Sequence, residues 1–186
     1  WLKNKINTTL KSLVDLQNLK DNNSSIKALA YQLYENNGVL KREQVAEYIK
    51  SLKQEERKVL RDLGVKFGRY HVFLHRLIKP EAVSLRTLLW KNYHQKNFNL
   101  KPPTFGLNFL DDKNFKNKNF MLLCGFEKFD NFFVRIDILE RLFMQIINSE
   151  KEVKIIPEML NLLGCNKEDF KKLLKNMGYK IIEKGN

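Results

Sequence analysis

The sequence SSIKALAYQLYENNG, residues 24–38, carries the clearest helical pattern of the chain. Its apolar residues recur at intervals of three and four, which places them on one face of an α-helix: Ile26, Leu29, Ala30, Leu33 and Tyr34. Ser24 is a residue type that caps a helix N-terminus, and Gly38, after two asparagines, is a residue type that ends a helix. The stretch therefore predicts a helix with one buried face.

Helical spacing continues on both sides of this stretch and predicts that residues 1–100 form a bundle of helices. Apolar residues are spaced for a helix from Leu2 to Leu16, and shorter helical patterns follow the central helix. Pro80 fits the first turn of a further helix, because that position needs no N–H donor. Only residues 65–74 break the pattern: a glycine interrupts an aromatic and β-branched run, which fits either a turn or a short hairpin.

Composition changes most within residues 101–118, which contain two prolines and an Asn/Lys-rich tract, and this predicts a linker. Residues 119–186 then predict a small subdomain with paired strands at 120–126 and 132–136. The predicted fold class is mainly α: a multi-helix bundle in residues 1–100, followed by a small α/β, helix-turn-helix-like subdomain with short strands.

The helix-turn-helix outline lies at residues 157–179. Pro157 opens a short helix that ends at a glycine, and Asn166 with Asp169 caps a second helix. A helix at 137–149 and a strand at 179–182 extend the outline toward a winged helix. The alternative interpretation is an αα-hairpin of a helical protein, whose lysines form a solvated face.

The formal net charge is +13, from 34 basic and 21 acidic residues. Such an excess attracts polyanions, first nucleic acid and second an anionic membrane surface. A bias in the amino-acid usage of the genome explains lysine in place of arginine, but it does not explain the shortage of acidic residues. The charge therefore favours contact with nucleic acid.

Two further features predict a cytoplasmic protein. No stretch approaches the roughly 20 apolar residues that span a membrane, and the start of the chain has no signal-peptide pattern. Cys124 and Cys165 are typical of free thiols in a reducing compartment, with a disulfide as the alternative. Because the sequence begins at Trp1, we expect it to be a piece of a longer chain.

Two groups of cations are candidate nucleic-acid contacts. The segment 64–80 interleaves aromatic residues with cations, a combination suited to single-stranded RNA or DNA; we expect its apolar members to be core and its binding residues to be Lys66, Arg69, Arg76 and Lys79. The second helix of the helix-turn-helix outline offers phosphate contacts through a further set of lysines: Lys167, Lys171, Lys172 and Lys175.

No catalytic or metal site is predicted. The chain lacks the GxxxxGK[ST] phosphate loop and the GxSxG nucleophile motif, so we expect no enzyme activity and no cofactor in this chain. His71 and His75 have the spacing of metal ligands on one helix face, but no third ligand lies nearby in the sequence. The acidic pairs at 55–56 and 111–112 fit a helix N-terminus and a loop.

Several segments, in order, resemble the region C-terminal to the motor in alphaproteobacterial superfamily-two ATP-dependent helicases, which are relatives of the mitochondrial degradosome RNA helicase. The resemblance covers most of the chain and is weakest over residues 101–119. The segments that carry it are Ala28–Ala30, Asn37–Leu40, LRDLGVKFG at Leu60–Gly68, LIKP at Leu77–Pro80, LRTLLW at Leu85–Trp90, VRIDILER at Val134–Arg141 and Leu163–Cys165.

The resemblance implies a parent protein that unwinds RNA or DNA duplexes with ATP. ATP and Mg²⁺ would bind only in the upstream helicase core of the same chain, and this region would hold or guide the strand that leaves the motor. The alternative is a protein-interaction module that docks a nuclease or a ribosomal partner, with its basic charge incidental.

Overall fold

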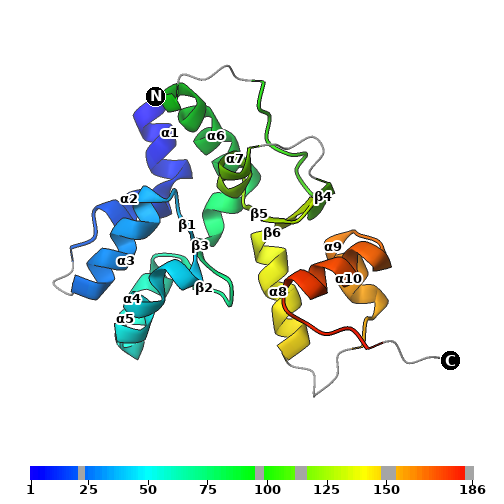
Figure 1. Ribbon diagram of the computed structural model, residues 1–186. Helices are drawn as coiled ribbons and strands as arrows, with labels where there is room; N and C mark the ends of the chain where they lie inside the picture. The colour runs from blue at the N-terminus through cyan, green and yellow to red at the C-terminus, as the bar shows by residue number, and fades with distance from the viewer. Residues whose placement is uncertain (21–23, 95–98, 112–116, 148–153, 183–186) are drawn as a thin grey trace. The chain divides into compact units, whose positions relative to one another are not determined.

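The computed structural model describes residues 1–20, 24–94, 99–111, 117–147 and 154–182 of the 186-residue chain. The protein is mainly helical, as predicted for the fold class, and it has two small antiparallel sheets, one of which lies in the region predicted as a helical bundle (Figure 1). The chain divides into two compact units, which are described separately below. Unit 1 comprises Trp1–Pro103 and Leu122–Gly125, and unit 2 comprises Thr104–Met121 and Phe126–Asn186.

Unit 1 contains α-helices joined by short connections and two 3₁₀-helical turns. These elements are α1 (Leu2–Thr9), α2 (Lys11–Gln17), α3 (Ser24–Glu35), η1 (Arg42–Val45), α4 (Ala46–Ser51), α5 (Gln54–Asp62), η2 (His75–Ile78) and α6 (Pro80–His94). Pro80 opens α6 as predicted.

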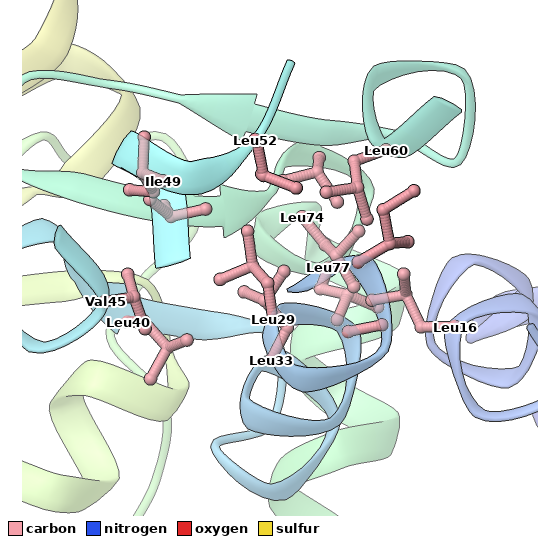
Figure 2. Packing of buried hydrophobic residues seen from close by; sticks show 14 of the residues in the cluster. Leu16, Leu29, Leu33, Leu40, Val45, Ile49, Leu52, Leu60, Leu74 and Leu77 are labelled. Carbon is pink, nitrogen blue, oxygen red and sulfur yellow. The ribbon is translucent and has the colours of Figure 1, made fainter. Parts of the chain in front are cut away.

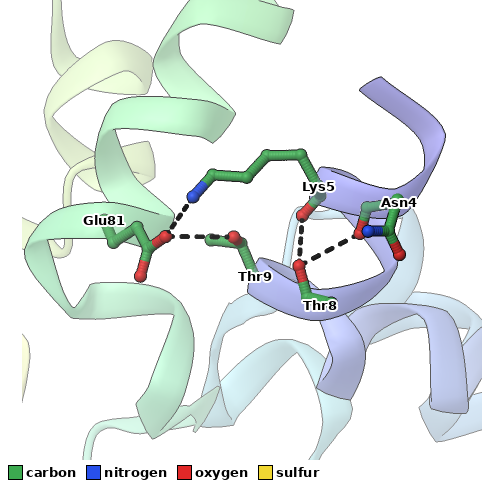
Figure 3. A network of polar contacts seen from close by, with 5 residues as sticks. All are labelled: Asn4, Lys5, Thr8, Thr9 and Glu81. Carbon is green, nitrogen blue, oxygen red and sulfur yellow. Dashed lines mark hydrogen bonds and ion pairs between the residues drawn. The ribbon is translucent and has the colours of Figure 1, made fainter. Parts of the chain in front are cut away.

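The single helix predicted from Leu2 to Leu16 is divided at Leu10, so that prediction is wrong. The hydroxyl of Thr8 donates to the backbone carbonyls of Asn4 and Lys5, at 3.0 and 3.1 Å (Figure 3). Such side-chain bonds compete with the helical ladder, and β-branched residues are weak helix formers, so the helix ends after Thr9. The side chains of Lys5 and Thr9 both donate to the carboxylate of Glu81 on α6 (Figure 3).

Unit 1 also contains a three-stranded antiparallel sheet, in the order β1-β3-β2. Its strands are β1 (Val39–Lys41), β2 (Val65–Phe67) and β3 (His71–Leu74). Residues 65–74 thus form the hairpin that was one of the two alternatives. Strand β1 was not predicted, because three residues are too few to show a period of two.

The core of unit 1 forms where α3 meets one face of this sheet (Figure 2). Pairing of Leu40 with Val72 places both side chains on the core face. Leu29 and Leu33 of α3 are 0% exposed, and Tyr34 is half-buried. The predicted apolar stripe of α3 is therefore the inner face of a helix.

Unit 2 is built around a second antiparallel sheet, in the order β4-β6-β5, followed by three helices. The elements are β4 (Phe109–Asp111), β5 (Phe126–Phe129), β6 (Phe132–Arg135), α8 (Ile136–Ile147), α9 (Pro157–Leu163) and α10 (Lys167–Asn176). Strand β4 lies within the predicted linker 101–118 and pairs with β6. The core of the unit includes Ile136, Leu139 and Phe170, each 0% exposed.

The strand predicted at 120–126 is wrong, because most of it belongs to helix α7 (Lys118–Leu123). The side-chain oxygen of Asn117 accepts a hydrogen bond from the Phe120 backbone N–H at 2.9 Å, which caps the helix start. Buried residues recur three apart, at Phe120 and Leu123 and again at Met121 and Cys124. A short apolar run does not distinguish this pattern from a buried strand.

The strand predicted at 179–182 is also absent, since these residues lie in no helix or strand. A strand forms only where a neighbour completes its backbone hydrogen bonds, and no described strand pairs with this segment. The last residues of the helix predicted at 137–149, residues 148 and 149, lie outside the described residues.

None of the helices in the described parts of the chain is long and apolar enough to cross a lipid bilayer. Cys124 is buried, Cys165 is half-buried, and both are free thiols, as the two-thiol interpretation predicted.

Candidate nucleic-acid interface

The net positive charge of the protein comes almost entirely from unit 1. Counted over the full sequence, unit 1 has 20 basic and nine acidic residues, whereas unit 2 has 14 basic and 12 acidic residues. The net charges are therefore +11 and +2, which together give the +13 of the chain. A polyanion is attracted mainly to unit 1.

A stretch of 18 residues of unit 1 without an acidic residue coincides with the predicted binding segment. No Asp or Glu lies between Asp62 and Glu81, and the four cations of that interval are all exposed: Lys66, Arg69, Arg76 and Lys79. Among the described residues, no carboxylate pairs with Lys66, Arg76 or Lys79. Their charge is therefore not cancelled locally.

These four cations are spread along strand β3 and do not meet at one point. Arg69 lies in the turn before β3, Arg76 lies in η2 after it, and Lys79 follows η2. Lys66 pairs with Phe73, between the two ends. Because a strand advances roughly 3.3 Å per residue, the first and last of the four residues of β3 lie about 10 Å apart. This spacing suits a ligand with repeated phosphates better than one small anion.

The apolar members of the segment are core, as predicted: Val65, Val72 and Leu74 are 0% exposed, and Phe73 is also buried. Phe67 is half-buried against the core, and the guanidinium carbon of Arg61 lies 5.9 Å from its ring centroid. Any stacking on a base would therefore fall to the remaining ring surface of Phe67 or Tyr70.

Sequence reasoning missed Arg42, which lies at the start of η1 and contacts the same turn. Its Nη1 donates to the carbonyl of Gly68 at 2.7 Å, and its backbone N–H donates to the carbonyl of Tyr70 at 2.8 Å. Gly68 lies 26 residues away in sequence, so no local pattern indicates the contact. Only the unpredicted pairing of β1 with β3 brings Arg42 there.

The lysines of α10 are more nearly neutralised than Lys66, Arg76 and Lys79 of unit 1. Lys167, Lys172 and Lys175 are exposed and Lys171 is half-buried. Lys171 pairs with Glu168 at 3.4 Å, and Lys172 pairs with Asp169 at 3.2 Å. The same two acidic residues lie in the first turn, where they complement the helix dipole.

Arg86 is a cation of unit 1 that is unsuited to ligand contact, because it is 3% exposed. Its guanidinium donates to the carbonyls of Asn37 and Leu123. Burial lowers the pKa of Arg86 to about 10, so it remains charged at neutral pH. Burial raises the pKa of the adjacent Cys124 thiol to about 12, and the charge of Arg86 opposes part of that rise.

The histidine pair does not form a shared helical face. His71 lies in β3 and is buried, whereas His75 lies in η2 and is half-buried. Within the described parts of the chain, no group of three or more His, Cys, Asp or Glu side chains is arranged to hold a metal ion.

Comparison with known proteins identifies no relative: no family model, no curated protein and no solved structure matches this chain.

Proposed function

We propose that this chain is a nucleic-acid-binding region and that unit 1 makes most of the contact. The observation that carries the proposal is the run of exposed cations along β3, without an acidic residue between Asp62 and Glu81, in the unit with net charge +11. Phosphates that contact such cations release condensed counterions, which supplies much of the binding free energy.

The sequence resemblance supports a more specific proposal, that the region is an accessory part of an ATP-dependent helicase. In this proposal, the ATP- and Mg²⁺-binding motifs belong to a motor in the same parent chain. The cations along β3 would hold a single strand of RNA or DNA as it leaves that motor, because they repeat along a line and can meet successive phosphates.

We propose α8, α9 and α10 as a helix-turn-helix-like element that makes a weaker second contact. Gly164, in the left-handed conformation, ends α9, and the side chain of Asn166 caps α10 by accepting from the Asp169 N–H at 2.8 Å. Phe170, Leu173 and Leu174 point into the core, which leaves the exposed lysines of α10 outward. Their ion pairs and the small net charge of unit 2 make this contact secondary.

Binding to a short fluorescently labelled oligonucleotide, measured by anisotropy over a series of salt concentrations, tests the proposal. Affinity for single-stranded RNA or DNA should fall with salt, with a log–log slope of about −0.7 for each phosphate contacted. An affinity that is the same at low and physiological salt contradicts a phosphate-contacting surface.

A pair of double variants separates the surface from net charge alone. Arg76→Gln with Lys79→Gln removes two cations of the β3 line. Lys11→Gln with Lys50→Gln removes the same charge from unit 1, but at positions paired with Asp15 and Glu47, at 2.7 and 2.9 Å. The first variant should lose much more affinity than the second. Equal losses would mean that net charge, and not this surface, attracts the nucleic acid.

One observation favours the alternative of a protein-docking module. Helix α6 exposes Leu88 and Tyr93, by 54% and 84%. Exposed apolar side chains that form one contiguous patch are typical of a surface that a partner covers. Salt-independent oligonucleotide binding, together with binding of a nuclease or ribosomal partner that is lost in Leu88→Ser with Tyr93→Ser, would favour this function over nucleic-acid binding.

A further inference from the structure

The turn that carries Arg69 is held from outside by a second arginine. Within residues 68–70, Arg42 binds the carbonyls on both sides of Arg69: Nη1 contacts Gly68 at 2.7 Å and the backbone N–H contacts Tyr70 at 2.8 Å. The Gly68 N–H in turn donates to the carbonyl of His71 at 2.8 Å, which closes the hairpin. Arg69 is thus the central residue of a turn that is fixed at both neighbours.

The position of Arg42 explains why it can affect binding without itself being the main contact. Arg42 is half-buried and its Nη1 donates a hydrogen bond to the Gly68 carbonyl, whereas Arg69 is exposed. An unsupported turn would have to be ordered when the ligand binds, and that ordering lowers affinity. A turn that is already fixed lets the Arg69 guanidinium meet a phosphate at a smaller entropic cost.

We propose that Arg42 is a positioning residue for Arg69, which holds the β2–β3 turn so that Arg69 can contact a phosphate of a single strand. This inference rests on the proposed function and identifies the part of the surface that is preorganised. Arg42 acts through the backbone of the turn, and Arg69 makes the contact.

A double-mutant cycle in binding tests this division of roles, with Arg42→Gln, Arg69→Gln and the double variant against a short labelled single strand. One phosphate contact with a log–log salt slope of about −0.7 raises affinity roughly eightfold at 50 mM salt relative to 1 M salt. Arg69→Gln should therefore weaken binding at 50 mM salt by about eightfold. Arg42→Gln should weaken binding by about threefold in the parent and by less than about 1.5-fold when Arg69 is already replaced. Its salt slope should shift toward that of Arg69→Gln.

Arg57→Gln is the matched control, because Arg57 is also half-buried and its Nη2 donates to a backbone carbonyl, that of Ile49, at 2.8 Å. It removes the same charge from the same unit, away from the turn, and should change affinity by less than about 1.5-fold. Arg42→Lys keeps the charge and a donor with nearly the reach of the guanidinium, unlike the shorter Gln amide, and should bind within about twofold of the parent. Circular dichroism melts of every variant establish that binding is measured on folded protein.

The outcomes distinguish this inference from the proposed function. If the parent shows no salt-dependent binding, the proposed function fails and the inference fails with it. If the parent binds and Arg69→Gln weakens binding, but the effect of Arg42→Gln is absent or simply adds to it, Arg42 is not a positioning residue and the proposed function stands. Should Arg42→Gln fail to fold, the same cycle with Arg42→Met decides, because Met keeps an apolar stem but has no donor for the Gly68 carbonyl.

Discussion

The guanidinium of Arg86 donates a hydrogen bond to the backbone carbonyl of Leu123, which lies 37 residues further along the chain. A second N–H of the same guanidinium donates to the carbonyl of Asn37, just after α3. One buried cation therefore holds the ends of two segments that are distant in sequence. Both contacts lie inside unit 1, since Leu123 belongs to the short segment Leu122–Gly125.

Arg86→Lys should destabilise unit 1 by about 1–3 kcal/mol, because one ammonium group cannot reach both carbonyls and a buried acceptor is left without a donor. Urea unfolding followed by circular dichroism measures the change. Arg76→Lys is the control, since it makes the same replacement at an exposed position. Equal stability of the two variants would show that the double contact of Arg86 contributes nothing.

Gly38→Ala should be more destabilising than Gly64→Ala, although both glycines have positive φ, of 79° and 94°. The left-handed conformation costs an alanine roughly 1–2 kcal/mol at either site. At Gly38 the added Cβ would also overlap the side chain of Leu77, whereas at Gly64 its nearest neighbour is 3.9 Å away. Overpacking adds about 1–3 kcal/mol, so urea midpoints should separate the two variants. Coinciding midpoints would mean that Leu77 moves aside freely.

Both cysteines should react slowly with a thiol reagent in the folded protein. Burial raises the pKa of Cys165 to about 11 and that of Cys124 to about 12. A raised thiol pKa favours the neutral form, so at pH 8 the thiolate fraction of Cys165 is roughly 0.1%, compared with about a quarter for an ordinary cysteine. Labelling monitored by mass spectrometry should accelerate as the pH approaches 11, with Cys165 modified before Cys124. Rapid labelling of Cys124 at pH 8, comparable with that in urea, would contradict this.

Charge reversal in α10 should weaken nucleic-acid binding less than charge reversal in unit 1. Lys167→Glu with Lys175→Glu changes exposed residues of the nearly neutral unit, and Arg76→Glu with Lys79→Glu makes the same change in the strongly basic unit. Both double variants should unfold within about 0.5 kcal/mol of the parent, as exposed substitutions usually do. If the α10 variant loses more affinity in anisotropy titrations, the helix-turn-helix-like element is the main contact.

Phe170→Ala should cost unit 2 about 3–5 kcal/mol, because the ring is 0% exposed and its removal leaves a cavity. Thermal melts by circular dichroism measure the loss, and Lys172→Ala on the exposed side of α10 is the control. A variant as stable as the parent would place Phe170 outside the core in solution.

The helices with local signals could be predicted from the sequence. The stripe of α3, the proline at the start of α6 and the Asn166 cap of α10 each lie within one element, so the spacing of a few residues was enough. Helix α7 was mistaken for a strand, because the five-residue apolar run at 120–124 is too short to show a helical period.

The candidate site was only partly predictable for a different physical reason. The exposed cations of residues 64–80 could be found because they lie within one short stretch of the sequence. The contacts of Arg42 with Gly68 and of Arg86 with Leu123 span 26 and 37 residues. Both depend on which strand or helix end lies alongside, and that pairing is a tertiary property with no local signature.

The short segment Leu122–Gly125 has a practical consequence for how this protein can be dissected. A truncated chain that stops after Pro103 contains every helix and strand of unit 1 from α1 to α6, yet it lacks a piece that packs in that unit. Ile78 would lose its close neighbour Gly125, and Arg86 would keep its charge but lose the Leu123 carbonyl. A protein that ends at Pro103 lacks residues 122–125, which pack in unit 1, and is therefore an incomplete domain. Its instability would say nothing about the stability of the intact chain.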